Sequence, residues 1–186
     1  MHHLRAVRWG VALVCFLGAL SAFGAWNPGG AALASTAPAG LTCGRWLVVP
    51  SPNVGSEGSS LAGVRALSKS DAWAVGSASN GSISQTLAEH WNGSAWSIVS
   101  TPNVGTGTNG LGAVDAVSPH DAWAVGLYDD GTTFRTLAEH WDGSSWKVVA
   151  TPNVGAGENA LTSVAVIASD DVWAVGYRRT TSVPRA

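Results

Sequence analysis

An unbroken internal repeat of 50 residues constrains this chain more than any other feature of its sequence. The motif "TPNVG" occurs at Thr101 and again at Thr151, and "TLAEHW" occurs at Thr86 and Thr136. The related motif "SPNVG" begins at Ser51, 50 residues before the first "TPNVG". The motif "DAWAVG" begins at Asp71 and again at Asp121, with the same offset of 50 residues. A constant offset without insertions predicts that each repeat folds into the same structural unit, stacked on its neighbours.

Each repeat contains four short strand-like segments. In the first whole repeat they are residues 61–68, 72–78, 86–91 and 95–100, here named strands A to D. Asn92 and Gly93 separate C from D, and Asn-Gly between two strand-like runs is a strong hairpin signal. The 23 glycines and only 12% charged residues suit close-packed β-structure with many turns. The sequence therefore predicts an all-β fold.

Four strands in about 50 residues is the pattern of a β-propeller blade. With "DAWAVG" and "EHWDGSSW", the sequence resembles kelch and galactose-oxidase-like propellers, in particular the secreted bacterial repeat type. The resemblance spans Cys43 to Gly176 and implies the fold without implying an activity. The double glycine of kelch repeats and the copper ligands of galactose oxidase are missing, so no catalytic residue, metal or cofactor is predicted.

The predicted organisation is a signal peptide (1–34), a linker (35–42) and partial propeller blades (43–186). Residues 43–50 form a lone strand D, 51–100 and 101–150 form two blades, and 151–186 form an incomplete blade. This order predicts the N-terminal part of a longer propeller, or alternatively a short chain that assembles into a ring with its own copies. Open blade edges favour self-association.

The leader has the features of a secretory signal peptide. Arg5 and Arg8 precede an apolar run over residues 10–26, and small residues precede a cleavage point after Ala34. The predicted location is therefore secreted or cell-surface, with a membrane anchor formed by residues 10–26 as the alternative. Cleavage would leave Cys43 as the lone cysteine, with no partner for an intramolecular disulfide.

Charge excludes one class of partner and leaves others open. The net charge is −2, and no segment gathers enough basic residues to follow a phosphate backbone, so nucleic-acid binding is not predicted. The expected ligand is a protein or a glycan. The predicted function is an exported, non-catalytic binding or scaffold module at the cell surface. The alternative is the propeller part of an extracellular carbohydrate-active enzyme.

The repeated "AEHW" invites interpretation as a site, but side chains alternate along a strand. Glu89 and His90 therefore face opposite sides, and each is expected to bond to the neighbouring blade, with a metal shared by His90 and His140 as the alternative. Asp71 is expected to cap the A–B turn. Recurring tryptophans are expected to fill the space between blades rather than stack on sugars. They are Trp73, Trp91, Trp96, Trp123, Trp141, Trp146 and Trp173.

Connections between strands alternate between two rims. The A–B and C–D turns barely vary between repeats, whereas the B–C and D–A connections differ, as "SASNGSIS" differs from "LYDDGTTF". Loops that shape an asymmetric site have to differ, so a ligand is expected on the second rim, although neutral drift also produces variable loops. The candidate ligand-binding residues there are Asn103, Tyr128, Asp129 and Asp130.

Overall fold

The computed structural model describes residues 11–14, 47–54 and 56–180. Within these ranges every regular element is a β-strand, which confirms the predicted all-β class. No helix in the described part of the chain is long and apolar enough to cross a membrane. The predicted linker, Cys43, Trp46 and most of the predicted signal peptide lie outside the described residues.

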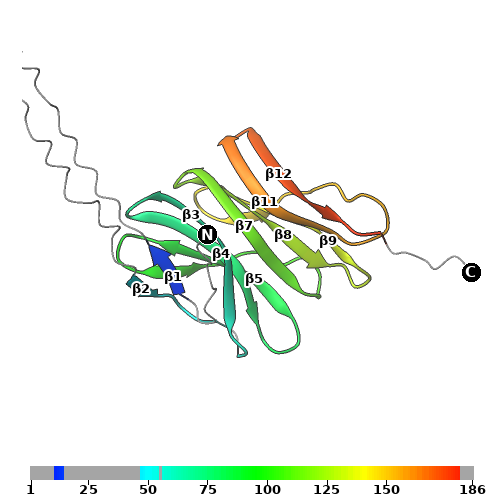
Figure 1. The fold of residues 1–186 in the computed structure, drawn as a ribbon, viewed down its shortest axis with the longest axis horizontal. Coiled ribbons are helices and arrows are strands. Elements are labelled where there is room, and N and C mark those ends of the chain that lie inside the picture. Colours follow the sequence, from blue (N-terminus) through cyan, green and yellow to red (C-terminus); the bar gives the residue numbers. More distant parts are fainter. Residues whose placement is uncertain (1–10, 15–46, 55, 181–186) are drawn as a thin grey trace, which may run out of the picture.

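Two four-stranded antiparallel sheets form the body of the molecule (Figure 1). Sheet I contains β3 (Ser59–Ser68), β4 (Asp71–Ser79), β5 (Ser84–Trp91) and β6 (Trp96–Val99) in that order. Sheet II contains β7 (Asn109–Ser118), β8 (Asp121–Asp129), β9 (Phe134–Trp141) and β10 (Trp146–Val148). Each strand lies in the segment that its hydrophobic alternation and flanking turn residues predict.

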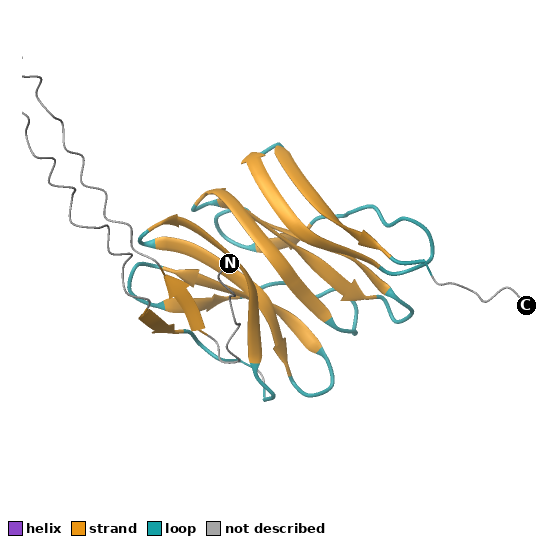
Figure 2. Ribbon diagram, in the orientation of Figure 1, coloured by secondary structure: helices purple, strands orange, loops and turns teal. Residues whose placement is uncertain are grey.

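Two smaller sheets flank this body. Sheet III consists of β11 (Asn159–Ala168) paired with β12 (Asp171–Arg178). At the opposite end, β1 (Val11–Val14) pairs antiparallel with β2 (Leu47–Pro50). Figure 2 shows that strands and their connecting turns account for the whole described fold.

The sheets pack face to face in chain order, with β7 against β3 and β4, and β11 against β7 and β8 (Figure 1). Trp73, Val75 and Ala88 of sheet I meet a face of sheet II that includes Leu111 and Val114. The next interface repeats this pattern. There Val125 and Ala138 of sheet II meet Val164 of sheet III. The apolar faces predicted from alternation are thus buried between sheets.

A glycine in the second strand of each sheet lets that strand approach the first one closely. A Cβ atom placed on Gly76 would lie 1.8 Å from the carbonyl oxygen of Ser60, and one on Gly126 would lie 2.0 Å from that of Gly110. The approach coincides with a register shift in β3 between Leu61 and Gly63. The glycine of the "AVG" motif is therefore a steric requirement of the bulged strand pair.

Candidate functional site

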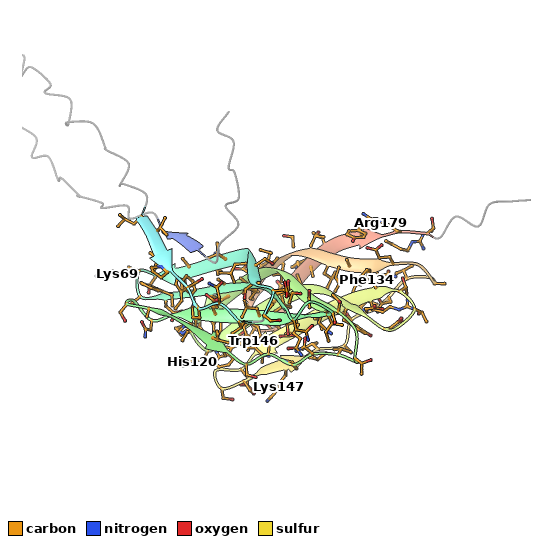
Figure 3. All side chains as sticks on the ribbon, turned by 90° about the horizontal axis from the view of Figure 1, so that it is seen from below. Lys69, His120, Phe134, Trp146, Lys147 and Arg179 are labelled. Carbon is orange, nitrogen blue, oxygen red and sulfur yellow. The ribbon has the colours of Figure 1, made fainter. Side chains whose placement is uncertain are left out.

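The connections between strands lie at two opposite ends of the sheets. We call one end the turn rim (residues 69–70, 92–95, 119–120 and 142–145). There the Trp91 indole Nε1 donates to the Lys69 carbonyl at 3.1 Å. The other end, the loop rim, comprises residues 51–54, 56–58, 80–83, 101–108 and 130–133. Figure 3 places Lys69 and His120 at the end of the molecule away from Phe134 and Arg179.

The repeated Glu-His pair does point to opposite faces, but its partners differ from those expected. The His90 ring packs on Trp73 with ring centroids 4.6 Å apart, and its Nε2 lies 3.1 Å from Oδ1 of Asp71. His140 and Asp121 repeat this contact at 2.9 Å. The predicted bond between neighbouring repeats was wrong for histidine, because the adjacent strand of the same sheet already offers a carboxylate.

The same contact corrects the role expected for the repeated aspartate. Asp71 and Asp121 hold the histidine of the third strand instead of capping the A–B turn. The turn itself is held by a hydroxyl, since the Ser70 amide donates to Ser68 Oγ at 3.1 Å. Burial opposes ionisation of Asp121, but hydrogen bonds from Ser169 and His140 outweigh it and lower its pKa.

Glu139 is the most unusual polar group of the molecule. Its carboxyl is fully buried, and within the described residues neither oxygen has a hydrogen-bond partner. It faces sheet I, since its cross-strand neighbour Ala124 belongs to the core between sheets I and II. Burial raises the pKa of Glu139 to about 8. The predicted bond to a neighbouring sheet was therefore wrong here too, and the carboxyl is enclosed too deeply to meet a ligand.

Glu89 occupies the matching position in sheet I and faces the same way, toward β2, since its cross-strand neighbour Ala74 clusters with Val49 of that strand. Burial raises its pKa to about 7, and a hydrogen bond with the Ser51 side chain opposes part of that rise. Both glutamates are thus structural groups between layers rather than members of a common site.

The recurring tryptophans differ in burial: three are buried, three are partly buried and one is exposed. Trp73, Trp96 and Trp146 are buried, and Trp73 lies 5.1 Å from Trp146 across the interface between sheets I and II. Those at the ends of the third strands, Trp91 and Trp141, are partly buried and donate to turn-rim carbonyls. Trp123 is partly buried against His140, and Trp173 is exposed.

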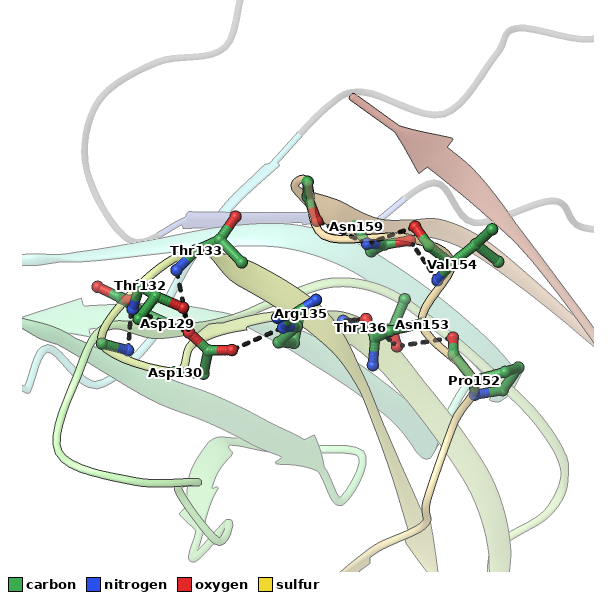
Figure 4. A network of polar contacts seen from close by, with 12 residues as sticks. Asp129, Asp130, Thr132, Thr133, Arg135, Thr136, Pro152, Asn153, Val154 and Asn159 are labelled. Atoms are coloured by element: carbon green, nitrogen blue, oxygen red, sulfur yellow. Dashed lines mark hydrogen bonds and ion pairs between the residues drawn. The ribbon is translucent and has the colours of Figure 1, made fainter. Parts of the chain in front are cut away.

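Asn103 is part of a clasp at the loop rim. Its Oδ1 accepts hydrogen bonds from the Thr86 amide at 2.9 Å and from the Thr86 hydroxyl at 3.3 Å. Asn153 makes the same contacts with Thr136 in sheet II (Figure 4). These hydrogen bonds hold the D–A connection against the third strand. Of the polar atoms of the Asn103 side chain, only Nδ2 therefore remains available to bind a ligand.

Asp129 and Asp130 organise the loop between β8 and β9 (Figure 4). Asp130 Oδ1 accepts from the amides of Thr132 and Thr133, and its Oδ2 accepts from Arg135 Nε at 2.6 Å. Hydrogen bonds from Thr132 and Arg135 hold the pKa of Asp130 well below its ordinary range. Tyr128 packs against the core between sheets I and II. The structure thus groups Tyr128, Asp129 and Asp130 in sheet II and leaves Asn103 with sheet I.

A cavity of about 210 Å³ opens beside Asn103 at the loop rim of sheet I. Its polar lining includes Asn80, Gln85 and Thr101, and Val54 and Ile98 contribute apolar surface. None of the described residues that line it carries a charge. Asn80 and Gln85 were not predicted from the sequence, although both fall in or beside the variable B–C connection that indicated this rim.

In sheet II the residues that match Asn80 and Gln85 in the repeat are Asp130 and Arg135. These two side chains bond to each other, whereas Asn80 Oδ1 accepts only loop amides, those of Ser82 and Ile83 at 3.0 Å. An ion pair in one sheet is therefore replaced by two neutral amides in the other, beside the cavity.

No group of three or more potential metal-ligating side chains occurs among the described residues. A scan against protein-family models, a search of curated proteins and a search of solved structures each found no match for this chain. Function must therefore be inferred from the site itself.

Proposed function

We propose that this protein is an exported binding module of the propeller type that holds a neutral, hydroxyl-rich ligand, a glycan, at the loop rim of sheet I. The observation that supports the ligand class is the uncharged lining of the cavity beside Asn103. Binding sites of this kind combine apolar surface with a few placed hydrogen-bonding groups.

The lining offers what a neutral sugar requires. The Nδ2 group of Asn80, the amide of Gln85 and the Nδ2 group of Asn103 can donate to hydroxyl oxygens, while Val54 and Ile98 can cover a sugar C–H face. A charged ligand would find no counter-ion among the described lining residues. Burying an unpaired charge there would be costly, so an acidic glycan is disfavoured.

The propeller arrangement is supported by the four-stranded antiparallel sheets packed face to face in chain order. Such a fold presents connections of neighbouring units on a common rim, where variable loops can form one site. Export is supported by the composition of residues 1–34. N-terminal sequencing of the protein from its secreting cell should find Ser35 first, and a mature chain beginning at Met1 would refute cleavage.

The ligand proposal is tested by an array of neutral and uronic-acid-containing oligosaccharides probed with the full chain. We expect binding to neutral oligosaccharides. The double substitution Asn80→Asp with Gln85→Arg installs in sheet I the ion pair that sheet II already contains. It should fold normally yet weaken binding at least tenfold, or by about 1.4 kcal/mol.

The matched control is the reverse exchange in sheet II, Asp130→Asn with Arg135→Gln, which should leave glycan binding unchanged. Equal binding by the sheet I double variant, or selective binding of acidic oligosaccharides, would contradict the proposal. Release of new reducing ends from bound oligosaccharides would instead favour the carbohydrate-active enzyme.

A further inference from the structure

Glu57 carries a charge beside a cavity whose described lining residues carry none. We propose that the Glu57 carboxylate binds an ammonium group of the ligand, so that the glycan held at the loop rim of sheet I contains an unacetylated amino sugar. The ligand class is that of the proposed function, on which this inference rests, with one group added. The sugar rings in the cavity stay neutral, and the positive charge lies at the cavity mouth.

Two contacts place Glu57 next to Asn80, which lines the cavity. The Glu57 amide donates to the carbonyl oxygen of Ser79, a second lining residue, at 3.2 Å. The Glu57 side chain lies over Gly81, since a Cβ atom placed on Gly81 would lie 3.1 Å from Glu57 Cγ and 3.8 Å from its Oε1. The carboxyl group therefore rests on the connection between β4 and β5, beside the cavity.

The Glu57 carboxylate is available to a ligand. The residue is exposed, and no described side chain or backbone amide forms an ion pair or a hydrogen bond with its carboxylate. The exposed acids of sheet II differ, because Asp130 is paired with Arg135 and Asp142 with Lys147. A carboxylate without a cation of its own can form a charge-assisted hydrogen bond with a cation that the ligand supplies.

The charge around the cavity indicates how many positive groups the ligand carries. Glu57 is the one charged residue among the described residues of the surrounding connections, 51–54, 56–58, 80–83 and 101–108. A second positive group would find no carboxylate among these residues, and a negative group would be repelled. A single ammonium group at the cavity mouth therefore complements this part of the surface.

The repeat confines this acid to sheet I. The residues that match Glu57 in the later repeats are Gly107 and Gly157. Cβ atoms placed on these glycines would lie 2.7 Å from the Asp129 carbonyl oxygen and 1.9 Å from that of Arg179. The later connections thus leave no room for a side chain at this position, whereas sheet I combines the uncharged cavity with an unpaired carboxylate.

An unacetylated amino sugar supplies the required group. Its amine is protonated at about pH 6, as an α-amino group is, whereas acetylation converts the amine into an uncharged amide. The remaining hydroxyls can still bond to the side-chain amides of Asn80, Gln85 and Asn103. Such a sugar therefore matches both the neutral lining and the carboxylate beside it.

The test is isothermal titration calorimetry of the full chain at about pH 6 with three short oligosaccharides of equal length, made of glucose, N-acetylglucosamine or glucosamine. The glucosamine oligosaccharide should bind about fivefold more tightly than the glucose oligosaccharide, the effect of one partly exposed ion pair. Glu57→Gln should remove this preference and leave binding of the glucose oligosaccharide unchanged. Glu158→Gln removes an equal charge beside β11, so this matched control should keep the preference.

Equal binding of the glucose and glucosamine oligosaccharides would overturn the inference. The proposed function would still stand in that case if Asn80→Asp with Gln85→Arg weakened both. A preference that survives Glu57→Gln, or that Glu158→Gln also removes, would overturn the ammonium contact as well, since general attraction to an acidic protein would then explain it. Tighter binding of the acetylated oligosaccharide than of the glucosamine one would contradict the contact directly. Failure of all three to bind would overturn the inference together with the glycan site.

Discussion

Trp73 and Trp173 occupy the same position of the repeat, yet only the first is enclosed by a following sheet. Replacing a fully buried tryptophan by alanine removes its contacts and leaves a cavity, at a cost of about 3–5 kcal/mol. We expect Trp73→Ala to lower the free energy of unfolding by that amount in chemical denaturation. Trp173→Ala, the matched control at a 66% exposed position, should cost far less.

Glu139 should make stability depend on pH. Burial raises its pKa from 4.5 to about 8, so between these values the folded chain holds a proton that the unfolded chain has released. The stability that the folded chain gains by keeping the Glu139 carboxyl protonated is therefore fully present below pH 4.5 and is lost as pH rises to about 8. The free energy of unfolding should fall across this window by up to about 1.4 kcal/mol per pH unit.

Glu139→Gln keeps the shape of the side chain and cannot ionise. Denaturation between about pH 5 and about pH 8 should show a shallower slope for this variant, with the largest gain in stability at the alkaline end. Some slope should persist, since the pKa of Glu89 is also raised. The exposed Glu57→Gln is the control. An unchanged slope in Glu139→Gln would mean that this carboxyl does not titrate in the folded protein.

At the scale of the strand, the glycine of the second strand sets how closely the first can approach. Gly126→Ala would place its Cβ 2.0 Å from the Gly110 oxygen, so the strands must separate or the bulge must shift. Forced overpacking costs about 1–3 kcal/mol. Gly110→Ala, whose Cβ would meet only the Ser77 side chain at 3.8 Å, should be nearly neutral. Thermal unfolding of the two variants compares them directly, and equal melting temperatures would contradict the steric explanation.

Strand positions were largely predictable, because turn residues and alternation repeat with a constant offset. The four segments predicted in the first repeat match β3 to β6 within two residues at each end. Alternation also predicted that Glu89 and His90 face opposite sides. It could not predict what covers each face, so the contact between His90 and Asp71 within one sheet was missed.

The candidate site was predictable in place but not in detail. Loop variability pointed to the rim that contains Asn103, which borders the cavity. It could not reveal that Asp130 is occupied by its own loop and by Arg135, since those contacts depend on the three-dimensional course of the B–C connection. The uncharged amides of Asn80 and Gln85 indicate a neutral ligand only when they are compared with the ion pair that Asp130 and Arg135 form at the matching positions of sheet II.

At the scale of the molecule, one aspartate joins all three main sheets. Asp115 of β7 accepts from Arg65 of sheet I at 3.0 Å and from the Val166 amide of sheet III at 2.8 Å. The innermost strands of consecutive sheets are thus linked by polar contacts, while tryptophans and small aliphatic residues fill the layers between them. Stability should therefore arise from contacts between sheets as much as from pairing within them.

The recurring tryptophans of sheets I and II hold these neighbouring sheets together through contacts between their rings. A double-mutant cycle between Trp73 of sheet I and Trp146 of sheet II measures this directly, because their rings meet edge to face across the interface. The free energies of unfolding of Trp73→Ala, Trp146→Ala and the double variant should yield a coupling of about 0.5–1.5 kcal/mol. A coupling indistinguishable from zero in a folded protein would contradict the face-to-face packing of the sheets.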